Sequence, residues 1–291
     1  MRIRLKFFLP FTLLLIWVAC MNHEKAFPLH IDHYVNFKSD YVASRNIEVM
    51  LPPGYIKEET KQYDVIYMHD GQNIFDAKTS YAGVAWQVDK AIVKLLEKAE
   101  IRPVIIVAIW NSPLRMNEYM PAQPLSLVRE KADREGWDGE LLSDNYLKFI
   151  VKELKPFIDS TYNASPKREH TFIMGSSMGA LISLYALAEY PEVFGGAACI
   201  STHWPALNGV FMDYVNSNLP EPGNHKLYFD FGTETLDSLY EPYQLKVDNI
   251  LTEKGYINEK HRITLKFEGA DHSEESWQER VHIPLMFFLE K

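Results

Sequence analysis

The stretch 173–181, IMGSSMGAL, holds a serine between two glycines in the spacing G-x-S-x-G. Counting from Gly175 puts Ser177 at the centre and leaves Ser176 on the flank. An apolar run ends at Gly175 and an Ala- and Leu-rich helical pattern begins at Gly179, so the glycines flank a strand-to-helix turn. Ser177 at such a turn is a candidate nucleophile. The alternative is a Gly-Ser turn whose serines only cap the helix, a role that suits Ser176 better.

A serine hydroxyl needs an imidazole base, and ten histidines compete for that role. His272 lies in FEGADHS, in the turn after the last predicted strand and before the last predicted helix, where a base belongs in this chain order. His261 precedes that strand, and His282 lies within the helical pattern. We therefore expect His272 to be the base; the alternative is a turn-capping or surface histidine.

The imidazole in turn needs an acid that holds its tautomer. The predicted strand 226–231 runs into GTETLD, a loop with two carboxylates, Glu234 and Asp237. Asp230 lies within the strand and is a poorer candidate. Asp237 is favoured as the acid, and Glu234 stays open.

An oxyanion hole needs two N–H donors. The first is the backbone N–H of Met178, directly after the serine. The second is expected in HDGQN, after the apolar run 65–68, where Gly71 lets the backbone turn and the N–H of Gln72 is the candidate donor. The alternative is an ordinary Asp-Gly turn.

Alternating strand and helix patterns must position these residues. Apolar strand-like runs occur at 46–51, 64–69, 103–110, 170–175, 196–201, 226–231 and 263–269, and helical patterns occur at 85–98, 144–158, 180–189, 243–254 and 275–289. This alternation predicts an α/β domain with a mostly parallel sheet. The region 111–142 lacks clear periodicity, and its place after a strand end suggests that it lines a cleft.

The composition limits the class of protein. A chain of 291 residues with 47% hydrophobic residues can bury a full core, and a net charge of −9 disfavours nucleic-acid partners. No metal-binding motif or glycine-rich nucleotide loop is present in the sequence, so no cofactor is expected.

The N-terminus has the pattern of a targeting segment. Three basic residues precede the apolar run 7–19, which ends at a lipobox-like Val-Ala-Cys with Cys20 as the modified residue. The prediction is a signal peptide of lipoprotein type over 1–20, a tether over 21–40 and one domain over 41–291. The protein would then be exported to the cell envelope, either periplasmic or bound to a membrane by a lipid anchor. The alternative is a plain signal peptide or an uncleaved anchor.

Four segments together resemble a known family. YDVIYMHDGQNIFD, NSPLRMNEYMP, FIMGSSMGALISLYALAEYPEVFG and GADHSEESWQERV are similar to the Putative esterase family of α/β-hydrolases, which includes ferric enterobactin esterases, S-formylglutathione hydrolases, feruloyl and acetylxylan esterases, and mycolyltransferases. The resemblance runs from about Tyr41 to the end. It implies an α/β-hydrolase fold with helices on both faces of the sheet. It also implies the nucleophile, base and oxyanion donors named above, with an acid in the loop after Gly232.

Two further residues are candidates for substrate binding. Arg115 could meet an anionic substrate group, or could instead pair with Glu118 and hold the long loop together. Trp204, with His203 beside it, could line the cleft or could pack in the core.

These patterns predict a serine esterase whose partner is a small-molecule or glycan ester, either a siderophore ester or an acylated polysaccharide. An acyltransferase that uses the same nucleophile is one alternative. The other is a non-catalytic lipoprotein that binds a ligand on a hydrolase scaffold.

Overall fold

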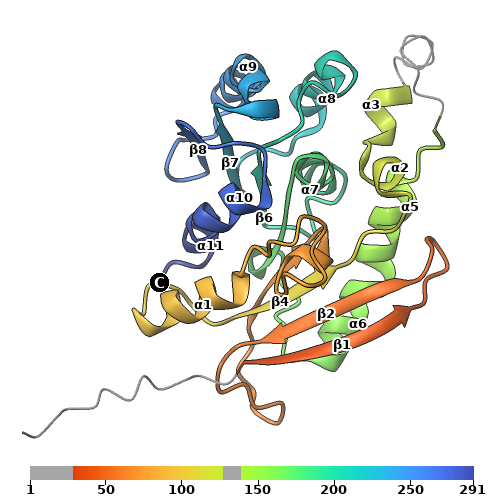
Figure 1. The fold of residues 1–291 in the computed structure, drawn as a ribbon, viewed down its shortest axis with the longest axis vertical. Coiled ribbons are helices and arrows are strands. Elements are labelled where there is room, and N and C mark those ends of the chain that lie inside the picture. The colour runs from red at the N-terminus through yellow and green to blue at the C-terminus, as the bar shows by residue number, and fades with distance from the viewer. Residues whose placement is uncertain (1–28, 127–138) are drawn as a thin grey trace, which may run out of the picture.

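An eight-stranded sheet forms the centre of the computed structural model, which describes residues 29–126 and 139–291 (Figure 1). Along the sheet the order is β1-β2-β4-β3-β5-β6-β7-β8. The strands are β1 (His30–Phe37), β2 (Arg45–Leu51), β3 (Asp64–Met68), β4 (Val104–Ile109), β5 (Thr171–Ser176), β6 (Gly196–Ile200), β7 (Lys226–Gly232) and β8 (Arg262–Phe267). Only β2 runs against its neighbours, so the predicted mostly parallel sheet is confirmed.

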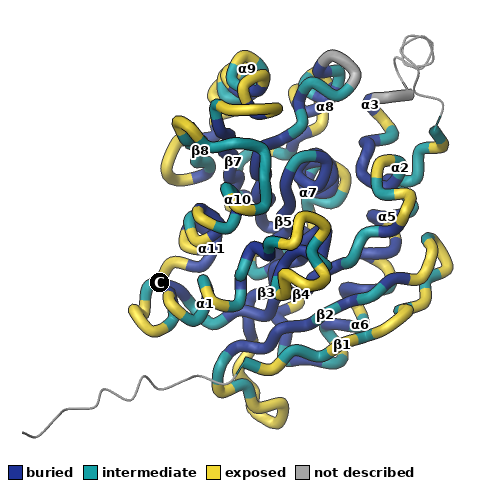
Figure 2. The backbone as a smooth tube through the Cα atoms, viewed as in Figure 1, coloured by how far each residue is buried: buried dark blue, intermediate teal, exposed yellow. Residues whose placement is uncertain are grey.

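The central strands are buried on both faces, which explains why they read as continuous apolar runs (Figure 2). Side chains alternate between two apolar layers: in β3, Val65 and Tyr67 join one layer, while Ile66 and Met68 join the other. The sheet therefore separates two hydrophobic cores.

Helices cover both faces, as expected for this fold class. The layer with Ile66 is covered by α1 (Val88–Glu97), α10 (Glu274–Arg280) and α11 (His282–Leu289). The layer with Val65 is covered by α2 (Arg115–Tyr119), α5 (Ser143–Lys148), α6 (Lys155–Thr161), α7 (Met178–Glu189), α8 (Val210–Asn218) and α9 (Glu241–Glu253). A further short helix, α3 (Ala122–Ser126), follows α2 and contacts α8.

The predicted helix 144–158 is continuous but not uniform. Between α5 and α6 the chain takes one π-helical segment, Phe149–Leu154. Pro156 directly follows the first residue of α6; it has no N–H to donate to the carbonyl of Lys152, and its ring crowds that carbonyl. A wider turn at this point accommodates the proline without breaking the helix.

The predicted tether over 21–40 is wrong in its second half. His30–Phe37 forms β1, which pairs antiparallel with β2, and Tyr34 and Phe37 pack their rings on Phe157 with centroids 5.0 Å and 5.2 Å apart. The strand escaped prediction because it lies at the sheet edge, where most of its side chains reach solvent. The predicted signal segment 1–20 and Cys20 lie outside the described residues. Within the described ranges, no helix has the length and apolar character needed to cross a membrane.

A buried ion pair ties α2 to β2. The guanidinium of Arg45 donates two hydrogen bonds to the carboxylate of Glu118, at 3.0 Å and 2.6 Å, and the Ser112 hydroxyl donates a third at 3.0 Å. Only 2% of the Arg45 side chain and 1% of the Glu118 side chain are exposed. The segment after β4 is therefore anchored to the sheet by a pair of charges rather than by apolar packing alone.

Removing one member of this pair leaves a buried charge without a partner. We expect Glu118→Ala to lower the free energy of unfolding by about 3–5 kcal/mol, measured by urea denaturation. The matched control is Glu241→Ala, which breaks an exposed pair with Lys266 and should cost about 1 kcal/mol or less. Equal effects of the two changes would contradict this assignment.

Candidate active site

Ser177 lies at a sharp turn between a strand and a helix. β5 ends at Ser176 and α7 begins at Met178, and Ser177 between them has φ 57° and ψ −121°, a conformation that a non-glycine residue rarely adopts. A Cβ on Gly175 would stand 2.8 Å from backbone atoms of Gly179, so only glycine allows the helix to start so close to the strand. The turn has the geometry that the G-x-S-x-G pattern predicts.

Two backbone N–H groups near Ser177 have no acceptor within the described chain. The N–H of Met178 belongs to the first turn of α7, where helical donors lack intrahelical partners. The N–H of Gln72 lies in the short 3₁₀ turn Gly71–Asn73, which follows Asp70 in a left-handed conformation (φ 55°). Both predicted oxyanion donors are thus available for an incoming acceptor.

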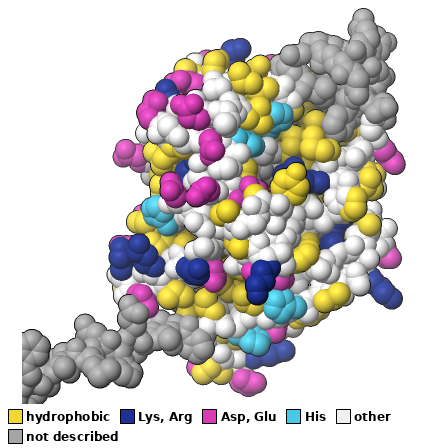
Figure 3. Space-filling view, in the orientation of Figure 1, with side chains coloured by type: hydrophobic (Ala, Val, Ile, Leu, Met, Phe, Trp, Pro, Cys, Tyr) yellow, Lys and Arg dark blue, Asp and Glu magenta, His cyan; other side chains and the backbone are white. Residues whose placement is uncertain are grey.

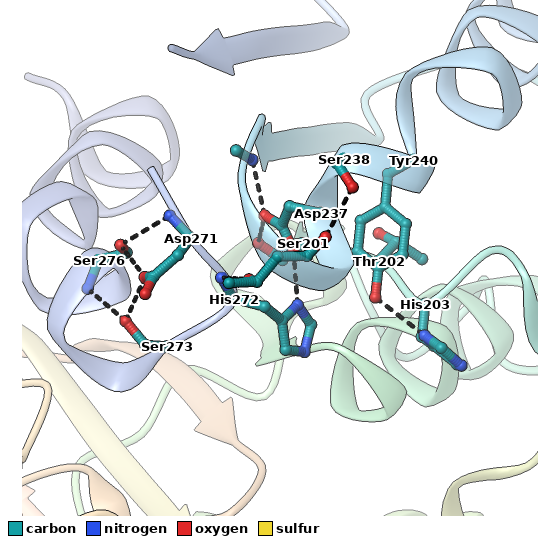
Figure 4. A network of polar contacts seen from close by, with 12 residues as sticks. Ser201, Thr202, His203, Asp237, Ser238, Tyr240, Asp271, His272, Ser273 and Ser276 are labelled. Atoms are coloured by element: carbon teal, nitrogen blue, oxygen red, sulfur yellow. Dashed lines mark hydrogen bonds and ion pairs between the residues drawn. The ribbon is translucent and has the colours of Figure 1, made fainter. Parts of the chain in front are cut away.

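Asp237, not Glu234, reaches the imidazole. The Nδ1 of His272 lies 2.5 Å from Oδ1 of Asp237, which is buried in the 3₁₀ turn Thr235–Leu239 after β7 (Figure 4). Glu234 is exposed and makes no side-chain hydrogen bond in the described chain. Of the two carboxylates in this loop, Asp237 is therefore the one that contacts His272, and its role as the acid stays a prediction.

Hydrogen bonds keep Asp237 ionised in spite of its burial. Burial alone would raise the pKa of this carboxyl, but the hydrogen bonds from His272, Ser201 and the N–H of Gly232 outweigh it and hold the pKa below its ordinary value. The Ser201 hydroxyl and the Gly232 N–H both reach Oδ2, each at 2.6 Å. A carboxylate with these donors is a fixed acceptor for one nitrogen of the imidazole.

The loop that carries His272 is held against the end of β7. A Cβ on Gly232 would stand 2.1 Å from the carbonyl oxygen of Ala270, so this close approach requires glycine. The backbone N–H of His272 donates to Oγ1 of Thr235 at 3.0 Å. Asp271 accepts from the hydroxyls of Ser273 and Ser276 and so fixes the turn into α10.

Ser177 and His272 line one cavity of about 460 Å³. The other lining residues are Asp70, Gln72, Asn73, Tyr81, Ala82, Asn111, Arg115, Ser176, Glu274 and Trp277. No hydrogen bond joins the side chains of Ser177 and His272 in the described chain. Catalytic hydrogen bonds are often loose in a site without substrate, so the shared cavity is the more informative observation.

Tyr240 was not anticipated from the sequence. Its ring is fully buried, its hydroxyl lies 2.9 Å from Nδ1 of His203, and its ring edge faces His272 with centroids 5.8 Å apart (Figure 4). Burial and the nearby Asp237 raise the pKa of Tyr240 above its ordinary value, so it remains a neutral hydroxyl beside the serine. No sequence motif marks this residue.

Arg115 lines the cavity, and the alternative of an ion pair with Glu118 is wrong. The guanidinium donates from Nε and Nη2 to the two oxygens of Asp70, both at 2.7 Å, while Glu118 turns away to Arg45. The pair lowers the pKa of Asp70 against the effect of its burial. Asn111 donates to the same carboxylate at 2.6 Å, so Asp70 organises this wall of the cavity.

Trp204 lies in the core rather than on the cavity wall. Its side chain is 1% exposed, its indole N–H donates to Gln244 at 2.9 Å, and its ring packs on Phe211 and Phe229. The core-packing alternative thus describes its place. His203, its neighbour, is half-buried and bonded to Tyr240.

Among the histidines in the described ranges, only His272 lines this cavity. His69 is buried behind the cavity with Nδ1 2.8 Å from the Tyr146 hydroxyl, and burial lowers its pKa to about 3. His261 bonds within the turn before β8, and His282 begins α11. Over 29–126 and 139–291, no group of three or more His, Cys, Asp or Glu side chains is placed to hold a metal ion.

Comparison with known proteins gives one family. The family model described as Putative esterase matches residues 42–283. The uncharacterized protein YbbA of Bacillus subtilis is 24% identical over 235 residues, which are 79% of this chain and 86% of YbbA. The ferri-bacillibactin esterase BesA of Bacillus subtilis is 27% identical over 150 residues, which are 49% of this chain and 49% of BesA, so that match spans about half of each protein.

A solved structure shares the fold. A ferulic acid esterase from Anaeromyces mucronatus, determined in complex with ferulic acid, superposes with a TM-score of 0.59 at 20% identity and covers 89% of this chain and 90% of its own.

Proposed function

We propose that this chain, which belongs to the Putative esterase family, is a serine hydrolase that cleaves a carboxylic ester through an acyl-enzyme on Ser177. The observation that carries the proposal is the hydrogen bond of 2.5 Å between Asp237 and His272 at the cavity that Ser177 lines. Ser177, Asp237 and His272 also follow one another along the sequence in the order nucleophile, acid, base that this fold uses.

The proposed reaction has two halves. Oγ of Ser177 forms a bond to the ester carbonyl carbon while its proton passes to Nε2 of His272. The developing oxyanion accepts hydrogen bonds from the N–H groups of Gln72 and Met178. The bond to the alcohol then breaks as His272 returns the proton to the leaving oxygen. Water, deprotonated by His272, then attacks the acyl carbon. The bond from that carbon to Oγ of Ser177 breaks as His272 returns the proton to Oγ, and the acid is released.

The charges at the cavity favour an uncharged acyl group. Its charged walls are Asp70, Arg115 and Glu274, and the guanidinium of Arg115 is already neutralised by Asp70. Glu274 also acts on Arg115, and these three side chains leave the wall with one net negative charge. Acidic side chains also gather over α9, β8 and α10 on this face (Figure 3). An anionic ester therefore meets repulsion, in contrast to the attraction that Arg115 alone would provide.

Between the two substrate classes predicted from the sequence, this charge pattern supports an acylated polysaccharide. A ferric catecholate siderophore is an anion, whereas acetyl and feruloyl esters of sugars are neutral. BesA is named for a ferric siderophore ester and the Anaeromyces enzyme for ferulic acid, so the relatives alone do not choose between them.

Two p-nitrophenyl esters of equal length test this proposal. We expect kcat/KM for the neutral butyrate to exceed that for the anionic hemisuccinate by about tenfold, after subtraction of the uncatalysed rate, since specificity is a difference in transition-state binding. Glu274→Gln should narrow the difference by raising the rate on the hemisuccinate. A preference for the hemisuccinate would contradict the charge argument. A protein that hydrolyses none of these substrates, whether the two p-nitrophenyl esters or acetyl and feruloyl sugars, would contradict the esterase proposal.

A further inference from the structure

The Ser201 hydroxyl stands directly behind the acid. Ser201 follows the last residue of β6 and is fully buried, so it does not contribute to the cavity wall. Its Oγ lies 2.6 Å from Oδ2 of Asp237, 3.0 Å from Nε1 of Trp277 and 2.8 Å from Nη2 of Arg280 (Figure 4 shows the contact with Asp237). One hydroxyl thus has three hydrogen-bond partners.

The chemistry of these partners fixes the direction of the hydroxyl proton. An indole N–H and a guanidinium are donors only, so Trp277 and Arg280 occupy the two lone pairs of the Ser201 oxygen. The single hydroxyl proton can then go only to Asp237. Oδ2 of Asp237 accepts this proton together with the N–H of Gly232, which favours the ionised carboxylate and leaves Oδ1 to accept from His272.

Arg280 extends the same arrangement deeper into the core. Its Nε donates to Oδ1 of Asp230 at 3.2 Å, and its Nη2 lies 3.8 Å from Oδ2 of Asp237. The side chain is buried, and the pKa of Asp230 is raised by burial despite the nearby guanidinium. The only cation in contact with these two carboxylates in the described chain is thus supplied from α10, through the residue that also bonds Ser201.

We propose that Ser201 is a positioning residue for catalysis: its hydroxyl, oriented by Trp277 and Arg280, holds Asp237 ionised and turned toward His272. The proposal rests on the proposed esterase activity and adds a residue that does not touch the substrate. Removal of the hydroxyl should loosen the carboxylate and slow the proton transfers, but should leave substrate binding intact.

Two replacements of Ser201 distinguish the effect of losing the hydroxyl from the effect of backbone strain. Ser201 has a φ of 43°, a conformation that glycine adopts without strain and alanine does not. Ser201→Ala and Ser201→Gly both remove the hydroxyl, yet they differ in backbone strain. We expect kcat to fall by about 10- to 100-fold in both variants, by analogy with the loss caused by removing groups that orient metal ligands, and we expect KM to stay within about twofold of wild type. The Gly variant keeps the test open if the Ala variant folds poorly.

A matched control removes a buried hydroxyl at the N-terminal end of a central strand, on the side of the sheet away from the site. Thr171 is fully buried at the start of β5 and donates to the carbonyl of Lys167 at 3.1 Å. Thr171→Val should leave kcat and KM unchanged. Melting temperatures of all variants show whether a lower kcat accompanies a loss of fold.

A double-mutant cycle tests whether Ser201 acts through Asp237. If it does, adding Ser201→Gly to Asp237→Asn should cause no further fall in kcat, whereas independent effects would multiply. Multiplying effects, a change in KM alone, or wild-type kcat in a folded Ser201→Gly variant would each overturn the proposal. If ester hydrolysis depends on Ser177 but not on Ser201, the positioning role of Ser201 is contradicted and the proposed esterase activity is not.

Discussion

Replacing Ser177 with alanine is expected to lower kcat by about five to six orders of magnitude, because the variant cannot form the acyl-enzyme. The fold should survive, since alanine differs from serine only by the hydroxyl. Residual turnover would come from the oxyanion donors of Gln72 and Met178 and from binding alone. The measurement is ester hydrolysis under substrate saturation, with thermal unfolding as the check on folding.

Covalent labelling with a fluorophosphonate probe tests the same assignment of Ser177 as the nucleophile. The wild-type protein should take up one label, located on Ser177 by peptide mapping, and Ser177→Ala should take up none. The natural control is Ser176→Ala, because Ser176 neighbours the nucleophile on the same cavity wall and should affect labelling far less. Equal labelling of wild type and Ser177→Ala, or a label on Ser176, would overturn the assignment of the nucleophile.

The second large effect is expected at the acid. Asp237→Asn keeps the shape of the side chain but removes its charge, and its amide can donate to Nδ1 of His272 and so stabilise the wrong tautomer. We expect kcat to fall by about 10⁴-fold at neutral pH. Because the pKa of Asp237 lies below its ordinary value, wild type keeps this carboxylate ionised at neutral pH. The asparagine amide gains no charge at higher pH, so raising the pH should not restore the missing carboxylate.

Glu234→Gln is the matched control for this experiment, since it makes the same chemical change in the same loop. Glu234 is exposed, so kcat should stay within about twofold of wild type. The reverse ranking, with Glu234→Gln inactive and Asp237→Asn active, would transfer the acid role and invalidate the geometry described for the site.

Much of the fold could be predicted from the sequence because the central strands are buried on both faces. Continuous apolar runs such as 104–109 mark such strands without any knowledge of their neighbours. β1 has no continuous apolar run, because none of its side chains is fully buried. Its place depends on pairing with β2 and on contacts with the ring of Phe157 in α6. The short helix α2 depends on a buried pair with β2 that no local pattern reveals.

The candidate site divides in the same way. Ser177 and His272 stand in local motifs with strict turn requirements, so their places could be predicted. Glu234 and Asp237 belong to one loop. Which carboxylate turns inward depends on a 3₁₀ turn and on two donors, Ser201 directly after β6 and Gly232 at the end of β7. The place of Trp204 could not be predicted, because the sequence around an aromatic residue after a strand end is the same whether its ring faces a cavity or the core.

The order of the sheet has a consequence for how activity arises during folding. Ser177, Asp237 and His272 follow β5, β7 and β8, and β8 is the outermost strand of the parallel series. A chain that has paired every strand except β8 would hold the nucleophile and the acid in place but lack the base. Recovery of ester hydrolysis on refolding therefore requires the docking of this edge strand in addition to the pairing of the central sheet.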